Sequence, residues 1–128
     1  MSSLIRAQVS AAALRANLAR IRAVAPGSRV MAVVKANAYG HGLVPTASCL
    51  ADADAFGVAR LEEALALRGA GIRAPIVLLE GVFDAEELGE AARHDLQIVV
   101  HHGAQVALLE RASFAHRIVV WLKVDTGM

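Results

Sequence analysis

The sequence predicts an α/β fold, because short apolar runs alternate along it with segments of helical pattern. Alternation of this kind implies parallel strands, since a crossover helix returns the chain to the same end of the sheet. The apolar runs carry apolar residues on both strand faces, which fits a parallel sheet covered by helices. Two architectures meet these conditions, a doubly wound open sheet and an eight-stranded barrel.

The first part of the chain contains a long helix and a short one. Residues 10–25 repeat apolar side chains at helical spacing, Ser10 can cap their start and a Pro-Gly pair ends them. Pro45 suits the first turn of a short helix over residues 45–50. Ahead of the long helix, residues 4–9 are predicted to form an additional strand outside the main sheet.

Three further helices have their own start and stop signals. Residues 61–68 form a helix that stops at the glycines that follow it. Asp84, followed three residues later by a glutamate, starts a helix over 84–94. Residues 104–111 form the last helix, with apolar side chains on one face.

The short apolar runs between these helices are the predicted strands. They are residues 30–34, 55–59, 75–79, 97–100 and 118–122. A complete (β/α)8 barrel needs eight strands and typically about 250 residues. Five strands in 128 residues therefore correspond to part of a barrel, if the fold is a barrel.

Composition excludes several classes of protein. A hydrophobic content of 56% is too high for a disordered chain. A net charge of +1 gives no sign of nucleic-acid binding. No apolar run reaches the roughly 18 residues of a membrane span, and no secretory signal is recognisable. Cys49 is the only cysteine, so no intrachain disulfide can form. A cytoplasmic protein is the default expectation.

Eleven of the thirteen basic residues are arginine, and the two lysines, Lys35 and Lys123, each follow an apolar run. Ligands bind parallel sheets at the carboxyl ends of the strands, where Lys35 is expected. Partial burial favours a neutral amine, which Schiff-base chemistry requires. The alternative is a lysine that extends from the strand end to solvent, and position alone favours this alternative.

The residues around Lys35 resemble a known signature. The run Lys-Ala-Asn-Ala-Tyr-Gly-His-Gly at 35–42, preceded by Ala-Val-Val, resembles the segment around the pyridoxal-phosphate lysine of alanine racemases. Further similarity covers residues 52–64, 78–81 and 123–128. The chain is identified as the N-terminal part of a member of that family, most similar to proteobacterial ones. The resemblance implies a partial TIM-type (β/α)8 barrel over residues 1–128, without the rest of the barrel and the C-terminal β domain.

The resemblance also implies a function, which is interconversion of L-alanine and D-alanine for peptidoglycan synthesis. Lys35 would hold pyridoxal 5'-phosphate as an aldimine and act as the base on the D-enantiomer. Tyr39 would donate a hydrogen bond to the cofactor phosphate, whereas without the motif it is as readily an ordinary amphipathic tyrosine. The family enzyme is a homodimer with shared active sites. The arginine that binds substrate and the second catalytic base would lie beyond Met128.

Lys123 has two interpretations. By resemblance it is a lysine that carbon dioxide carbamylates, so that the carbamate orients an arginine bound to the substrate carboxylate. From the residues alone, an ion pair with Asp125 is favoured, because residues two apart on a strand share a face.

Two alternative functions belong to other classes. One is a non-catalytic pyridoxal-phosphate-binding protein with a similar barrel, against which the Asn-Ala-Tyr-Gly-His-Gly run argues. The other is a fragment without activity, and we expect the isolated 128-residue chain to racemise little or no alanine. An apolar sheet with an open edge supports that expectation.

Other polar residues receive structural interpretations. No metal site is predicted, because His101 and His102 would point to opposite faces of a strand. His41 is expected to shape the loop after Lys35. Glu62 and Glu63 form a charge pair that suits a helix start, and Cys49 is expected in the core.

Overall fold

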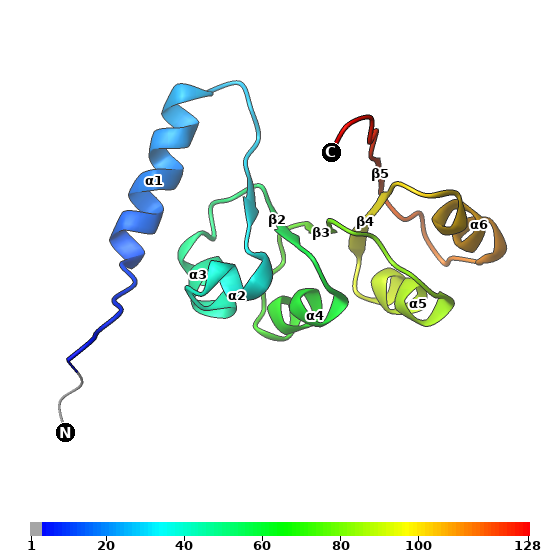
Figure 1. The fold of residues 1–128 in the computed structure, drawn as a ribbon, viewed down its shortest axis with the longest axis horizontal. Helices are drawn as coiled ribbons and strands as arrows, with labels where there is room; N and C mark the ends of the chain where they lie inside the picture. Colours follow the sequence, from blue (N-terminus) through cyan, green and yellow to red (C-terminus); the bar gives the residue numbers. More distant parts are fainter. Residues whose placement is uncertain (1–3) are drawn as a thin grey trace.

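The computed structural model describes residues 4–128, whose strands form a five-stranded parallel sheet in the order β1-β2-β3-β4-β5 (Figure 1). The strands are β1 (Met31–Val33), β2 (Ala55–Val58), β3 (Ile76–Leu78), β4 (Leu96–Val100) and β5 (Val120–Leu122). Each neighbour in the sheet is also the next strand in the chain. This sequential order is that of a (β/α)8 barrel rather than a doubly wound sheet. The predicted α/β fold, with five parallel strands of a partial barrel, is confirmed.

The helices are those that the sequence predicts, with one addition. They are α1 (Ala11–Val24), α2 (Lys35–Tyr39), α3 (Leu43–Cys49), α4 (Leu61–Gly69), α5 (Ala85–Arg93) and α6 (Gly103–Arg111). The ends of the five predicted helices and five predicted strands lie within two residues of the observed ends. The addition is α2, which the sequence predicts only as a turn. The strand predicted over residues 4–9 is wrong, because these residues form no strand and the described sheet begins at β1.

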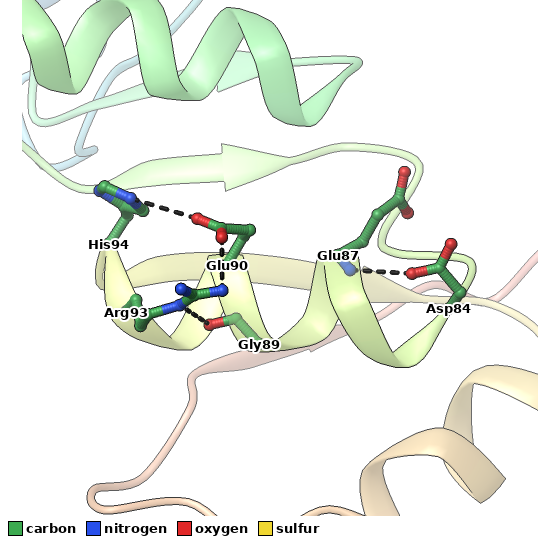
Figure 2. Close-up of polar contacts among 6 residues, drawn as sticks. All are labelled: Asp84, Glu87, Gly89, Glu90, Arg93 and His94. Atoms are coloured by element: carbon green, nitrogen blue, oxygen red, sulfur yellow. Dashed lines mark hydrogen bonds and ion pairs between the residues drawn. The ribbon is translucent and has the colours of Figure 1, made fainter.

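Local capping explains where two of the helices begin. The Ser10 hydroxyl accepts a hydrogen bond from the Ala13 amide of α1 at 3.2 Å. Figure 2 shows α5, where the Asp84 carboxylate accepts a hydrogen bond from the Glu87 amide at 2.8 Å. Each cap satisfies an amide that the helix itself leaves without a partner. The two predicted helix starts are therefore confirmed.

The two faces of the sheet differ. The crossover helices α3–α6 follow the strands along one side (Figure 1). Side chains that point to this side form the core together with side chains of the helices. Seven large residues of this core are at most 2% exposed: Phe56, Leu67, Ile76, Leu78, Leu88, Leu96 and Ile98. On the other face, the side chains of Met31 and Leu79 cover Gly57. A Cβ added at Gly57 would lie 3.1 Å from Met31 Sδ and 3.2 Å from Leu79 Cδ1. This face, called the concave face below, is the one that would line the interior of a closed barrel.

The strand β5 is the least buried part of the sheet. Trp121 is 44% exposed and Leu122 is 78% exposed, although both lie in a paired strand. Trp121 donates a hydrogen bond from Nε1 to Gln97 Oε1 at 2.8 Å, which joins β5 to β4 on the concave face. None of the helices in residues 4–128 combines the length and apolar character needed to cross a bilayer.

Candidate functional site at the carboxyl end of β1

Lys35 lies at the carboxyl end of the first strand. Val34 extends the ladder by one bond, from its amide to the Gly57 carbonyl at 2.8 Å, and then the backbone leaves the sheet. Val34 is 2% exposed and packs in the core, whereas Val33 is 41% exposed on the concave face. Val34 has a ψ of 21°, which is not extended, so Lys35 is the first residue of the turn that follows the strand. The half-buried Lys35 therefore stands at the carboxyl-end rim of the sheet, as predicted.

The residues after Lys35 form a left-handed helical turn. Ala36, Asn37, Ala38 and Tyr39 have φ values of 52°, 55°, 54° and 54°. For L-residues this conformation costs about 1–2 kcal/mol per residue, and it normally occurs at single positions rather than in runs. Four consecutive non-glycine residues in it constitute a backbone outlier of the kind that gathers at functional sites. The predicted turn is confirmed in place, but its handedness was not predicted.

Hydrogen bonds within the segment close this turn. The Ala38 amide donates to the Val34 carbonyl at 2.9 Å, and the Gly42 amide donates to the Asn37 carbonyl at 2.9 Å. The Asn37 side chain accepts from the Leu43 amide at 2.9 Å and so satisfies the first amide of α3. His41 lies 3.0 Å through Nδ1 from the Ala38 carbonyl oxygen. His41 therefore shapes the loop, as expected.

Two glycines complete the turn. Gly40 has a φ of +89° and Gly42 a φ of +93°, values that L side chains rarely adopt. The Gly40 amide donates to the Asn37 carbonyl at 3.1 Å. The prediction that these glycines permit the turn is confirmed.

A side chain distant in sequence also holds the turn. Glu63 Oε1 accepts a hydrogen bond from the Ala36 amide at 2.7 Å, and Glu63 Oε2 accepts from the amides of Ala59 and Arg60 at 2.9 and 3.0 Å. The expected role of Glu63 at a helix start is confirmed by the Arg60 bond. The bond to Ala36 was missed. The sequence signal for it was only the third-position glutamate of a helix start, which identifies a cap and not a contact with another loop.

The Lys35 ammonium and the Tyr39 hydroxyl can both contact a ligand. Within residues 4–128, the Lys35 ammonium makes no hydrogen bond or ion pair. Tyr39 is 62% exposed, and no contact within that part of the chain holds its hydroxyl. An amine and a phenol without partners, four residues apart on one fixed turn, are suited to a ligand that carries both a carbonyl group and an anion.

Lys123 lies directly after the fifth strand. Its amide donates to the Val100 carbonyl at 2.9 Å, and its ammonium lies 3.8 Å from Asp125 Oδ2 and 3.8 Å from Met128 Sδ. The predicted ion pair with Asp125 is confirmed. Lys123 also lines an open hollow of about 340 Å³ on the concave face, together with Leu79, Val99, Trp121 and Leu122. Three strands separate β1 from β5, so the structure does not bring the two lysines into contact.

The remaining polar candidates have structural roles. His102 accepts from the Ala104 amide through Nδ1 at 3.1 Å, and the His101 amide donates to Gln105 Oε1 at 2.9 Å. Within the described range 4–128, no group of three metal-binding side chains comes together. Cys49 is half-buried rather than fully within the core, because it is the last residue of α3 and lies at the edge of the packed face.

Comparison with known proteins agrees with this geometry. Residues 9–128 match the family model described as alanine racemase, N-terminal domain. The chain is 56% identical to an alanine racemase of Shewanella loihica over 96% of this chain and 34% of that protein. It is 53% identical to one of Shewanella baltica over 100% of this chain and 36% of that protein. The crystal structure of the biosynthetic alanine racemase from Pseudomonas aeruginosa matches with a TM-score of 0.87 and 42% identity, over 91% of this chain and 33% of that one.

The chain therefore belongs to the alanine racemase family, by its N-terminal domain. It spans about a third of the length of the curated relatives that it matches.

Proposed function

We propose that this chain forms the lysine-bearing part of a pyridoxal-phosphate-dependent enzyme that interconverts L-alanine and D-alanine. The observation that carries the proposal is the combination of a Lys35 ammonium that is unpaired in the described part of the chain and a fixed backbone turn directly after it. The ammonium has no partner within residues 4–128, and the backbone that follows Lys35 is held in a left-handed turn by several hydrogen bonds. Family membership supports the reaction and its substrate.

The residues present fit the cofactor. The Lys35 amine, at the carboxyl end of β1, is the group that binds an aldehyde covalently. The Tyr39 hydroxyl, exposed on the next turn of backbone, can donate a hydrogen bond to a phosphate oxygen. We propose these two residues as the cofactor-binding residues of the chain.

When bound, pyridoxal phosphate would delocalise the electron pair left on a substrate Cα after that carbon loses its proton. The role of the chain is to supply Lys35 at one defined place. Lys35 Nζ would hold the cofactor until substrate replaces it, and would then move the proton on one face of the substrate Cα. The fixed turn limits the directions from which that nitrogen approaches.

Further parts of the proposal concern the complete protein. We propose that residues 1–128 are the N-terminal part of a (β/α)8 barrel, with further strands and a C-terminal β domain elsewhere in the protein. The open five-stranded sheet and the greater length of the relatives support this. We also propose a cytoplasmic homodimer that supplies D-alanine for peptidoglycan, with Lys123 as a carbamylated lysine beside the substrate site.

The test uses the protein at its full natural length. Borohydride reduction followed by peptide mass spectrometry should locate the cofactor on Lys35, and racemisation should proceed from both enantiomers of alanine. Lys35→Ala should remove the label and lower the rate by roughly a thousandfold or more. Cofactor attached to Lys35 without any racemisation would instead favour a non-catalytic pyridoxal-phosphate-binding protein.

A further inference from the structure

Glu63 joins two loops at the rim of the sheet, and one of them carries Lys35. One oxygen of its carboxylate accepts a hydrogen bond from the Ala36 amide, and the other accepts hydrogen bonds from the Ala59 and Arg60 amides, at distances of 2.7 to 3.0 Å. The side chain is half-buried, and 27 residues separate Glu63 from Ala36. We propose that Glu63 is a positioning residue, which sets the direction of Lys35 by fixing the backbone that follows it.

The geometry explains how a bond at Ala36 acts on Lys35. The Ala36 amide shares a peptide plane with the Lys35 carbonyl, so a short bond to that amide fixes the orientation of the plane. Hydrogen bonds to a carboxylate are about twice as strong as those between neutral groups. Ala36 is also the first residue of the left-handed run, where an alanine prefers other conformations. Without Glu63, the plane can rotate and Ala36 can relax.

The proposal rests on the proposed role of Lys35, and it predicts a particular kinetic pattern. Glu63 bonds to backbone amides and, by this assignment, contacts neither substrate nor cofactor. Its loss should therefore lower kcat by about 10- to 100-fold, since small misplacement of a reacting group has effects of that size. The KM for alanine should change by less than about threefold, because the contacts that bind substrate remain.

The chain offers a matched control in the next helix. Glu87 is also the third residue of its helix, and its Oε2 accepts a hydrogen bond from the Phe83 amide at 2.8 Å. Figure 2 shows Glu87 at the start of α5, next to Asp84. Glu87→Ala removes a comparable bond between a carboxylate and a loop, but in the loop after β3 and not in the one after β1.

The experiment compares Glu63→Ala, Glu63→Gln and Glu87→Ala with the unchanged full-length protein. Hydrogen exchange of the peptide over residues 35–42 is measured first, without cofactor, and needs no activity. Steady-state kcat and KM follow, together with the pH dependence of the absorbance of the Lys35-bound cofactor. Unfolding in urea measures stability.

Support for the proposal is faster exchange over 35–42, a lower kcat and a shifted absorbance titration in Glu63→Ala, with none of these in Glu87→Ala. Glu63→Gln keeps one acceptor oxygen, so its kcat should lie between those of the alanine variant and the unchanged protein. If Glu63→Ala does not fold, the same comparison is made with Glu63→Gln.

The proposal is overturned if both alanine variants lose stability equally while kcat and exchange over 35–42 stay unchanged. It is also overturned if Glu63→Ala raises KM and leaves kcat alone. If the unchanged protein neither retains cofactor nor racemises alanine, the proposed function fails. The exchange experiment would still decide whether Glu63 holds the turn.

Discussion

Lys35 and Lys123 both follow a strand at the carboxyl edge of the sheet, yet their surroundings differ. Each lies just beyond the carboxyl end of a strand, Lys35 after β1 and Lys123 after β5. Lys35 is followed by a strained turn with many internal bonds, and its ammonium has no partner within residues 4–128. Lys123 follows an exposed strand, and its ammonium pairs with Asp125.

The difference shows which of the two lysines the surrounding structure holds in a defined position. A strained left-handed run persists only where surrounding bonds over-determine it, and this run lies next to the lysine that has no local partner. The Lys123–Asp125 pair is partly exposed, and such pairs contribute about 0–1 kcal/mol. The backbone at β1 thus fixes the position of Lys35, whereas only a weak contact holds Lys123.

The largest expected effect separates the two lysines directly. In the full-length protein, Lys35→Met should abolish borohydride trapping of cofactor and lower kcat/KM by roughly a thousandfold or more, because the covalent attachment and the base are lost together. Lys123→Met should leave trapping intact and raise the KM for alanine by about tenfold, the size expected for one charge-assisted hydrogen bond. Both are measured in the same racemisation assay.

Loss of cofactor in Lys123→Met, or retained activity in Lys35→Met, would contradict the proposed difference between the two lysines. The proposed carbamylation of Lys123 has a separate test. Depletion of carbon dioxide should weaken alanine binding in the unchanged protein, bicarbonate should restore it, and Lys123→Met should respond to neither.

A second prediction tests how strongly the turn depends on its own side chains. Asn37→Ala removes the acceptor of the Leu43 amide and places an alanine at a φ of 55°, which asparagine tolerates better. The free energy of unfolding should fall by about 1–2 kcal/mol, measured by urea titration. Asn17→Ala is the control, because Asn17 lies exposed within α1, where alanine is the better helix former. An equal loss in both variants would contradict a special role for Asn37.

A third prediction concerns the strain itself. Ala36 is exposed and has a φ of 52°, so Ala36→Gly removes the cost of a left-handed alanine. That cost is about 1–2 kcal/mol, and the greater flexibility of unfolded glycine offsets about 0.5–1 kcal/mol of the gain. Stability should therefore rise by about 0.5–1 kcal/mol in thermal or urea unfolding. Ala66→Gly, on the exposed side of α4, should instead lower it by about 1 kcal/mol. A fall in both would show that the turn carries no strain.

Much of the fold could be predicted from the sequence, because it depends on local patterns. Apolar runs and caps such as Ser10 and Asp84 determine the strands and helix starts. The placement of Lys35 followed from its position directly after an apolar run, at the carboxyl end of a predicted parallel strand. The strand predicted over 4–9 failed because a strand forms only by pairing with another strand, and a local pattern does not show whether that pairing occurs.

The part that could not be predicted depends on contacts distant in sequence. The left-handed turn needs the Glu63 carboxylate, 27 residues away from Ala36, and local preference alone opposes such a run. The exposure of β5 could likewise not be predicted, because the burial of a strand depends on what lies beside it and not on how apolar it is. The Lys123–Asp125 pair was predictable, since both residues belong to one local segment.

The smallest expected effect concerns the other end of the Lys35 strand, where Asp54 joins three elements. Asp54 Oδ2 accepts a hydrogen bond from the Val30 amide, just before β1, at 2.7 Å and lies 3.1 Å from Arg22 of α1. The hydrogen bond from the Val30 amide is the main cause that holds the pKa of Asp54 below its ordinary value of 3.8; burial opposes it, and the Arg22 charge adds a smaller lowering effect. A lowered pKa in the folded state stabilises the protein above pH of about 4, and this contribution disappears as the pH falls through the folded pKa.

Asp54→Asn should therefore reduce stability modestly at neutral pH, and the difference from the unchanged protein should vanish in strong acid. Urea unfolding at a series of pH values from neutral to acid measures this. Asp52→Asn, an exposed neighbour, should show no such pH-dependent difference. A difference that persists in strong acid would assign the effect to the shape of Asp54 rather than to its charge. Packing, and not the Asp54 charge, would then hold the start of β1. The contrast between the two lysines would in that case depend only on the turn after Lys35.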